Sequence, residues 1–190
     1  MKMVVALILS LATWPVFAAD VAGITLAETI QAGGGVPLVL NGVGLRKRAI
    51  FQVYAIGLYL PAKKSSAAEV LALAGPKRVA IHMLRDVGAD QFTEALADGI
   101  RQNHSEAEAM ALEPRLKELA AIMGEIKEAK KGMAIALDWL PQVGTQVLID
   151  SKPAGKTIPG EDFYRGLLRI WLGEDPVQAD LKKALLGQPQ

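Results

Sequence analysis

Two arginines and a tyrosine are the strongest candidates for chemistry in this sequence. Arg46 and Arg48 flank Lys47 just before residues 50–60, the most apolar of the expected strands. A guanidinium that enters an apolar sheet needs an anion or several carbonyl groups, because an unpaired buried charge is costly. Tyr54 follows Arg46 by eight residues, which places both side chains on one side of an unbroken strand. A phenol and a guanidinium that converge in an apolar cavity would suit a carboxylate with a long apolar tail.

A purely structural role for the same residues is the alternative. In that interpretation Arg46 pairs with a protein carboxylate such as Asp86, and Tyr54 fills part of the core. The spacing alone favours this alternative, so the candidate site needs support from elsewhere in the chain.

The other familiar kinds of site have little support in the sequence. His82 lies in an expected strand and His104 in an expected loop, where we interpret them as a satisfied or edge histidine and a solvated one. No spacing of His, Asp and Glu suggests a metal site, and the chain has no Cys. Gly42 and Gly44 lack the third glycine of a phosphate loop, and no serine nucleophile elbow is present. We therefore predict no catalytic residue, no metal and no cofactor.

The elements that must position Arg46 and Tyr54 can be inferred from periodicity and turn residues. Residues 50–60 alternate, with Gln52, Tyr54, Ile56 and Leu58 on one side. Ser105 and Glu108 form a capping box ahead of a helix that Pro114 should kink unless the helix begins there. Strands are expected at 37–41, 50–60, 77–84, 133–140, 145–150 and after a turn at 151–155; helices are expected at 66–74, 90–102, after 105, at 161–172 and from Asp175–Pro176 to 186. Strands followed by helices, twice over, indicate an α+β fold with an antiparallel sheet.

The first 19 residues resemble a secretory signal peptide. Lys2 precedes an apolar run that is too short to span a bilayer, and Val16 and Ala18 stand at the −3 and −1 positions of a cleavage site. We expect cleavage after Ala18 or Ala19, a periplasmic or secreted location, and one domain over residues 20–190. No later segment is long and apolar enough to cross a membrane.

The composition of the remaining chain excludes some classes of partner. It has 20 basic residues (21 − 1, without Lys2) and 20 acidic residues, and therefore no net charge. Nothing in this balance attracts nucleic acid or an anionic membrane, so we expect no nucleic-acid partner. The absence of Cys means that no disulfides stabilise the fold.

The segment NGVGLRKRAIFQVYAIGLYL, residues 41–60, resembles the chalcone isomerase superfamily. There a Gly-x-Gly-x-Arg strand leads into a strand ending in Ala-Ile-Gly-Val/Leu-Tyr-Leu. The stretch GEDFYRGLLRIWLGEDPVQADLKKALLG is similar to the closing helices of its bacterial branch. The resemblance covers residues 21–187. It implies an open-faced β-sandwich, in which a large antiparallel sheet carries helices over one face and a ligand cleft lies between them.

The resemblance also bears on catalysis. The family's cleft arginine falls on Arg46, but Tyr54, Phe92 and Gly99 stand where the catalytic enzymes have a threonine, the catalytic tyrosine and an asparagine. Ring closure of a chalcone needs groups that stabilise an enolate, and Phe92 and Gly99 donate no hydrogen bonds. Related plastid proteins bind fatty acids through an arginine and a tyrosine. We therefore expect a non-catalytic binding protein for a small amphipathic carboxylate such as a fatty acid, with Arg46, Tyr54 and Phe92 as ligand-binding residues. An intramolecular-lyase isomerase and an accessory protein with a filled cleft are the alternatives.

Overall fold

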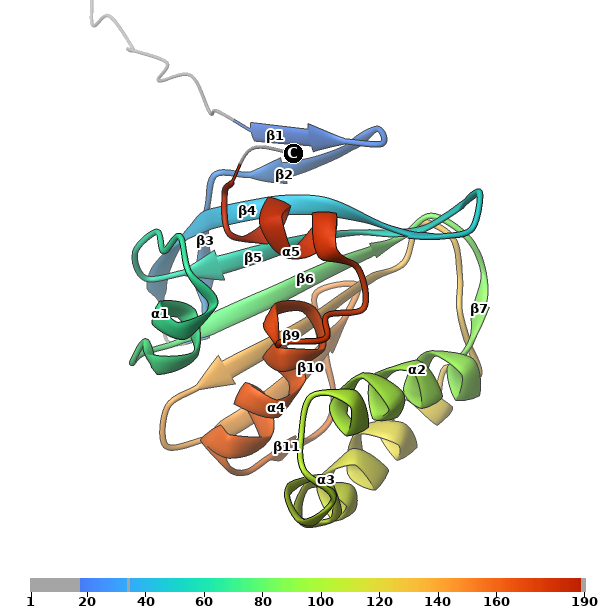
Figure 1. The fold of residues 1–190 in the computed structure, drawn as a ribbon. Helices are drawn as coiled ribbons and strands as arrows, with labels where there is room; N and C mark the ends of the chain where they lie inside the picture. Colours follow the sequence, from blue (N-terminus) through green and yellow to red (C-terminus); the bar gives the residue numbers. More distant parts are fainter. Residues whose placement is uncertain (1–17, 34, 189–190) are drawn as a thin grey trace, which may run out of the picture.

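A curled sheet of seven antiparallel strands forms the centre of the molecule (Figure 1). The computed structural model describes residues 18–33 and 35–188. Long-range pairing puts β6 (Lys77–Met83) beside β9 (Ala134–Leu140), so the two halves of the chain share one sheet. The strands lie in the order β11 (Lys152–Ile158), β10 (Gly144–Ile149), β9 (Ala134–Leu140), β6 (Lys77–Met83), β5 (Phe51–Leu60), β4 (Val36–Arg48) and β3 (Thr29–Ala32).

The helices cover one face of this sheet and enclose the main core (Figure 1). They are α1 (Ala67–Ala72), α2 (Ala89–Gln102), α3 (Glu106–Gly124), α4 (Glu161–Leu172) and α5 (Ala179–Leu185). The hairpin of β1 (Ala18–Val21) and β2 (Ile24–Ala27) packs on the opposite face, and β7 (Val87–Gly88) pairs with β8 (Glu128–Ala129) beside α2. The predicted α+β class and the large antiparallel sheet with helices over one face are confirmed.

The alternation predicted for β5 is confirmed and decides what the strand presents to each layer. Ile56 and Leu58 are fully buried in the core beneath the helices. Tyr59 instead belongs to a smaller cluster on the opposite face, with Leu40. Tyr54 shares the helix-facing side with Ile56, because side chains alternate along a strand. Tyr54 therefore lies between the sheet and the helices.

Helix α3 begins where the capping box predicts. Ser105 accepts from the backbone N–H of Glu108, and the Glu108 carboxylate accepts from the Ser105 backbone N–H. Pro114 lies inside α3, so the helix does not begin at the proline. Met110 is 64% exposed, and the buried residues of α3 are Leu112, Leu119, Ile122 and Met123.

Three predicted boundaries are wrong. Strand β4 runs seven residues further than residue 41, because Gly42 and Gly44 pair with β5. Strand β11 begins at Lys152, so the predicted turn at 151–155 is mostly strand, with Gly155 at a positive φ. Helix α5 begins at Ala179 rather than at Asp175–Pro176. Asn103 instead binds both the backbone N–H and the C=O of Asp175 in the connection between α4 and α5.

The predicted signal peptide lies almost wholly outside the described residues, which begin at Ala18 in β1. Within residues 18–33 and 35–188, the helices are all too short or too polar to span a bilayer.

Candidate functional site

Arg46, Tyr54 and Met83 stand side by side across three neighbouring strands. Arg46 of β4 is the register partner of Tyr54 of β5, and Tyr54 is the register partner of Met83 of β6. Directly paired residues of antiparallel strands project to the same face of a sheet. Met83 is fully buried in the core beneath the helices, so this row faces the helices. The predicted convergence of Arg46 and Tyr54 comes from cross-strand pairing and not from eight-residue spacing along one strand.

Trp171 completes the row from the helix side. It lies at the end of α4, it is 1% exposed, and its indole Nε1 donates to the Tyr54 hydroxyl over 3.0 Å. The tyrosine is partly buried and packs against the main core. The sequence carries no signal that the Trp171 indole N–H reaches a residue 117 positions earlier in the chain.

Arg46 has no carboxylate partner among the described residues. Its Nη1 donates to the Lys47 carbonyl and lies 3.4 Å from Oε1 of Gln178, a neutral side chain. Asp86 accepts instead from the backbone N–H of Lys131 over 2.7 Å. The structural alternative that pairs Arg46 with Asp86 is therefore wrong. A partly buried guanidinium without an anion can form a strong charge-assisted hydrogen bond with a carboxylate.

The Tyr54 hydroxyl has no hydrogen-bond acceptor for its own hydrogen among the described residues. Its oxygen accepts from Trp171, and no bond from its own hydrogen is formed within the described part of the chain. Burial raises the pKa of Tyr54 above its ordinary value, although the Trp171 hydrogen bond and the Arg46 charge act in the opposite direction. The phenol is therefore neutral at pH 7 and keeps its proton. The Arg46 guanidinium only donates, and the neutral Tyr54 phenol keeps a hydrogen to donate, which suits an anion.

Phe92 and Gly99 of α2 are both buried, and neither brings a polar group to this region. Phe92 is 7% exposed and belongs to the same core cluster as Met83. A Cβ added to Gly99 would lie 2.7 Å from Cγ2 of Ile170 on α4. Any side chain at position 99 would therefore force Ile170 to shift.

Gly42 and Gly44 give α5 its place above the sheet. A Cβ on Gly42 would lie 2.1 Å from the Ala184 carbonyl oxygen, and one on Gly44 would lie 2.5 Å from Cδ1 of Leu181. Only glycine lets the helix approach β4 this closely. The Gly-x-Gly that the sequence excluded as a phosphate loop thus lets α5 lie over β4 (Figure 1). The N-cap residue of α5, Gln178, lies beside Arg46.

Two cavities of the described structure lie away from Arg46. The larger, about 410 Å³, is a groove between α1, α3 and α4 that includes His104, Glu108, Arg165 and Arg169. The smaller, about 240 Å³, lies on the outer sheet face beside His82. His104 is half-buried and its Nδ1 lies 2.8 Å from the Ile100 carbonyl, so the expectation of a solvated histidine is wrong. Burial lowers the pKa of His82.

The described residues contain no group of three or more His, Asp or Glu that could hold a metal ion.

Comparison with known families agrees with this architecture. The family model described as chalcone isomerase-like matches residues 18–187. The chain belongs to the chalcone isomerase-like family. No curated protein matches it significantly.

A solved member of the same fold supports the assignment. The crystal structure of a fatty-acid binding protein from Arabidopsis thaliana superimposes with a TM-score of 0.67 at 16% sequence identity. The match covers 90% of this chain and 96% of the plant protein. At this identity the likeness establishes the fold, and the function of the chalcone isomerase-like chain must be argued from its own residues.

Proposed function

We propose that this chalcone isomerase-like protein binds a small amphipathic carboxylate, such as a fatty acid, and does not close a ring. The observation that carries the proposal is the pairing of Arg46 with Tyr54 on the helix-facing side of the sheet, with no carboxylate partner for the guanidinium among the described residues. A carboxylate accepts two hydrogen bonds readily, and it would receive them from the guanidinium and from the neutral phenol. The fatty-acid-binding title of the plant structure is consistent with this chemistry.

The apolar tail would extend along the sheet from Tyr54 past Met83 towards Phe92. All three belong to or pack against the main core. Methionine is the core side chain that adapts its shape most easily, so Met83 can yield space to an acyl chain. The cavities at α1–α3–α4 and on the outer face do not include Arg46 or Tyr54, so entry of a tail requires the residues around Met83 to repack.

Equilibrium binding of a fluorescent fatty acid, competed by unlabelled fatty acids of different lengths, tests this function. Arg46→Ala should weaken binding about 10- to 100-fold, because hydrogen bonds to a charged group contribute about 1.5–3 kcal/mol. Arg48→Ala is the matched control: it removes an exposed arginine two residues along the same strand. Arg165→Ala removes a cation from the larger groove instead.

Comparison of the variants shows where on the protein the ligand binds. Unchanged affinity in Arg46→Ala would refute the proposed site, and a loss confined to Arg165→Ala would place the ligand in the groove between α1, α3 and α4. Incubation with a chalcone should leave the enone absorbance unchanged. Turnover that Arg46→Ala abolishes would instead establish an isomerase.

We also propose that the chain is exported and that the mature protein acts in the periplasm or outside the cell. The support is the sequence of residues 1–19, with its positive start, short apolar run and small residues before Ala19.

A further inference from the structure

Gln178 lies where a helix cap is expected, but its side chain forms hydrogen bonds with the backbone of β4. It is the N-cap residue of α5 and makes no side-chain capping bond to that helix. Its Oε1 accepts from the Lys47 backbone N–H over 2.8 Å, and its Nε2 donates to the Leu45 carbonyl over 3.1 Å. The same Oε1 lies 3.4 Å from Nη1 of Arg46. One amide thus spans the irregularity in the β4–β5 ladder between Arg46 and Lys47.

The Gln178 oxygen is a neutral side-chain acceptor that lies beside two donors of β4. Around it stand the Arg46 guanidinium and the Lys47 N–H, while the Tyr54 hydroxyl, opposite Arg46, also has a proton to donate. A carboxylate oxygen in the same place would accept from the same two nitrogens. It would bind them more strongly than an amide oxygen does, because hydrogen bonds between charged groups are about twice as strong as neutral ones.

We propose that Gln178 is a built-in competitor whose amide oxygen occupies the place of the ligand carboxylate until the ligand displaces it. This inference rests on the proposed function and adds to it: Lys47 N–H becomes part of the carboxylate site, and residue 178 sets the affinity. A neutral amide is suited to the role, since it satisfies the Lys47 N–H in the empty protein without forming an ion pair that a ligand could not break.

When the ligand displaces the amide, the Gln178 side chain moves and α5 stays in place. The end of the helix is held against the sheet by its close approach to Gly42 and by the bond from Asn41 Nδ2 to the Leu185 carbonyl, 2.7 Å long. The connection before the helix is held by Asn103 and by Lys182, whose Nζ donates to the Gly173 carbonyl. Gln178 itself is only partly buried and can rotate towards solvent.

The test is the fatty-acid binding assay on Gln178→Glu and Gln178→Ala. Gln178→Glu supplies a tethered carboxylate beside Arg46, so the apparent affinity for the fluorescent fatty acid should fall at least tenfold. Gln178→Ala removes the competitor, so the affinity should rise several-fold. Gln188→Glu is the matched control, because it makes the same change at a glutamine that binds the Ser65 carbonyl away from Arg46. It should bind like the wild type.

Thermal unfolding makes the inference testable apart from the function. Gln178→Glu should raise the melting temperature, and the rise should vanish in the double variant Arg46→Ala/Gln178→Glu. Binding by Gln178→Glu equal to that of the wild type, or a melting temperature independent of Arg46, would overturn the inference and leave the proposed function standing. Absence of binding by the wild type would refute the proposed function instead.

Discussion

Arg46 and Tyr54 are directly paired across β4 and β5 and project to the same side of the sheet. Trp171 donates to the tyrosine from α4, and Gln178 contacts the arginine from the start of α5. These four residues therefore connect strands β4 and β5 to helices α4 and α5. Changes to the strands, the helices or the charges around them should each have a measurable effect.

The close packing of α5 on β4 predicts that alanine substitution at two glycines has different effects on the free energy of unfolding. Gly42→Ala should lower the free energy of unfolding by about 1–3 kcal/mol, because the new Cβ would lie 2.1 Å from the Ala184 carbonyl and backbone atoms yield little. Gly124→Ala, at a helix end with no atom within 4 Å of the new Cβ, should be neutral or slightly stabilising. Urea unfolding measures both. Equal effects would show that α5 does not need the glycine.

The raised pKa values of the three tyrosines predict how tyrosine ionisation and stability of the folded protein change at high pH. Burial raises the pKa of Tyr54 and Tyr164, and it raises the pKa of Tyr59 to about 12. A raised pKa means that the folded state holds the proton more tightly, so the stabilisation is complete below pH 10 and is lost as the pH rises towards 12. Tyrosinate absorbance at pH 10 should be small in the folded protein and large in urea. A full phenolate signal from folded protein at pH 10 would contradict the burial.

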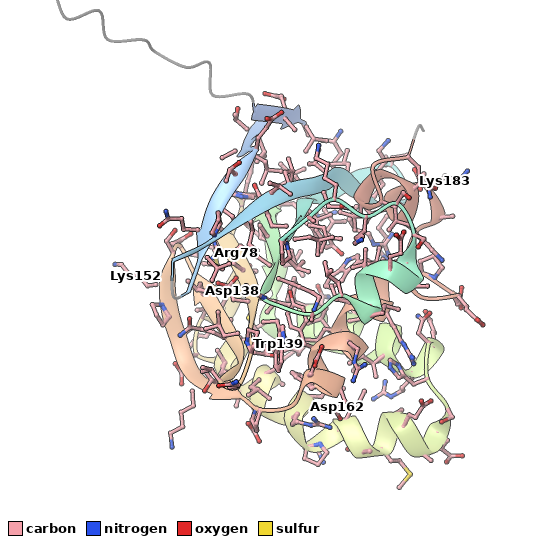
Figure 2. All side chains as sticks on the ribbon, turned by 90° about the vertical axis from the view of Figure 1, so that its left-hand side faces the viewer. Arg78, Asp138, Trp139, Lys152, Asp162 and Lys183 are labelled. Carbon is pink, nitrogen blue, oxygen red and sulfur yellow. The ribbon has the colours of Figure 1, made fainter. Side chains whose placement is uncertain are left out.

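The buried ion pair of Arg78 and Asp138 predicts a large stability effect on the sheet, where the two side chains lie together (Figure 2). Asp138 is 1% exposed and accepts two hydrogen bonds from the guanidinium. Arg78→Ala should cost about 3–5 kcal/mol, because it leaves a buried charge unpaired. Arg101→Ala, which breaks an exposed pair with Asp98, should cost less than about 1 kcal/mol. Similar losses in both variants would contradict this difference.

The proposed export predicts the N-terminus of the mature protein. Expression of the full chain in a bacterium with a working secretion system should yield protein that begins at Ala19 or Asp20. Intact mass and N-terminal sequencing measure it. Recovery of the uncleaved chain from the cytoplasm would contradict the proposal.

Local patterns predicted most of the elements. The alternation of residues 50–60 gave both faces of β5, and the bounds of α4 agree with the prediction because Gly173 ends the helix. The short strands β1, β2 and β3 were missed, since four-residue segments carry too little periodicity. The predicted start of α5 failed because a tertiary contact, Asn103 with Asp175, outweighs a local capping signal.

The candidate site was only half predictable. Arg46 and Tyr54 stand out by residue type in an apolar context, whereas Trp171 and Gln178 join them through contacts that span more than 100 residues. Such contacts depend on how α4 and α5 cross the sheet, which no local pattern encodes. The same holds for Gly42 and Gly44, whose role requires knowing what lies above them.

The most direct test of the central claim observes the ligand carboxylate itself. Palmitate labelled with ¹³C at the carboxyl carbon should give a distinct bound resonance with the wild-type protein, and the bound carboxyl should titrate at a lower pH than free fatty acid because the Arg46 cation favours its ionised form. The resonance should be lost in Arg46→Ala and kept in Arg48→Ala and Arg165→Ala. A bound resonance that is unchanged in Arg46→Ala would contradict a carboxylate site at Arg46 and Tyr54.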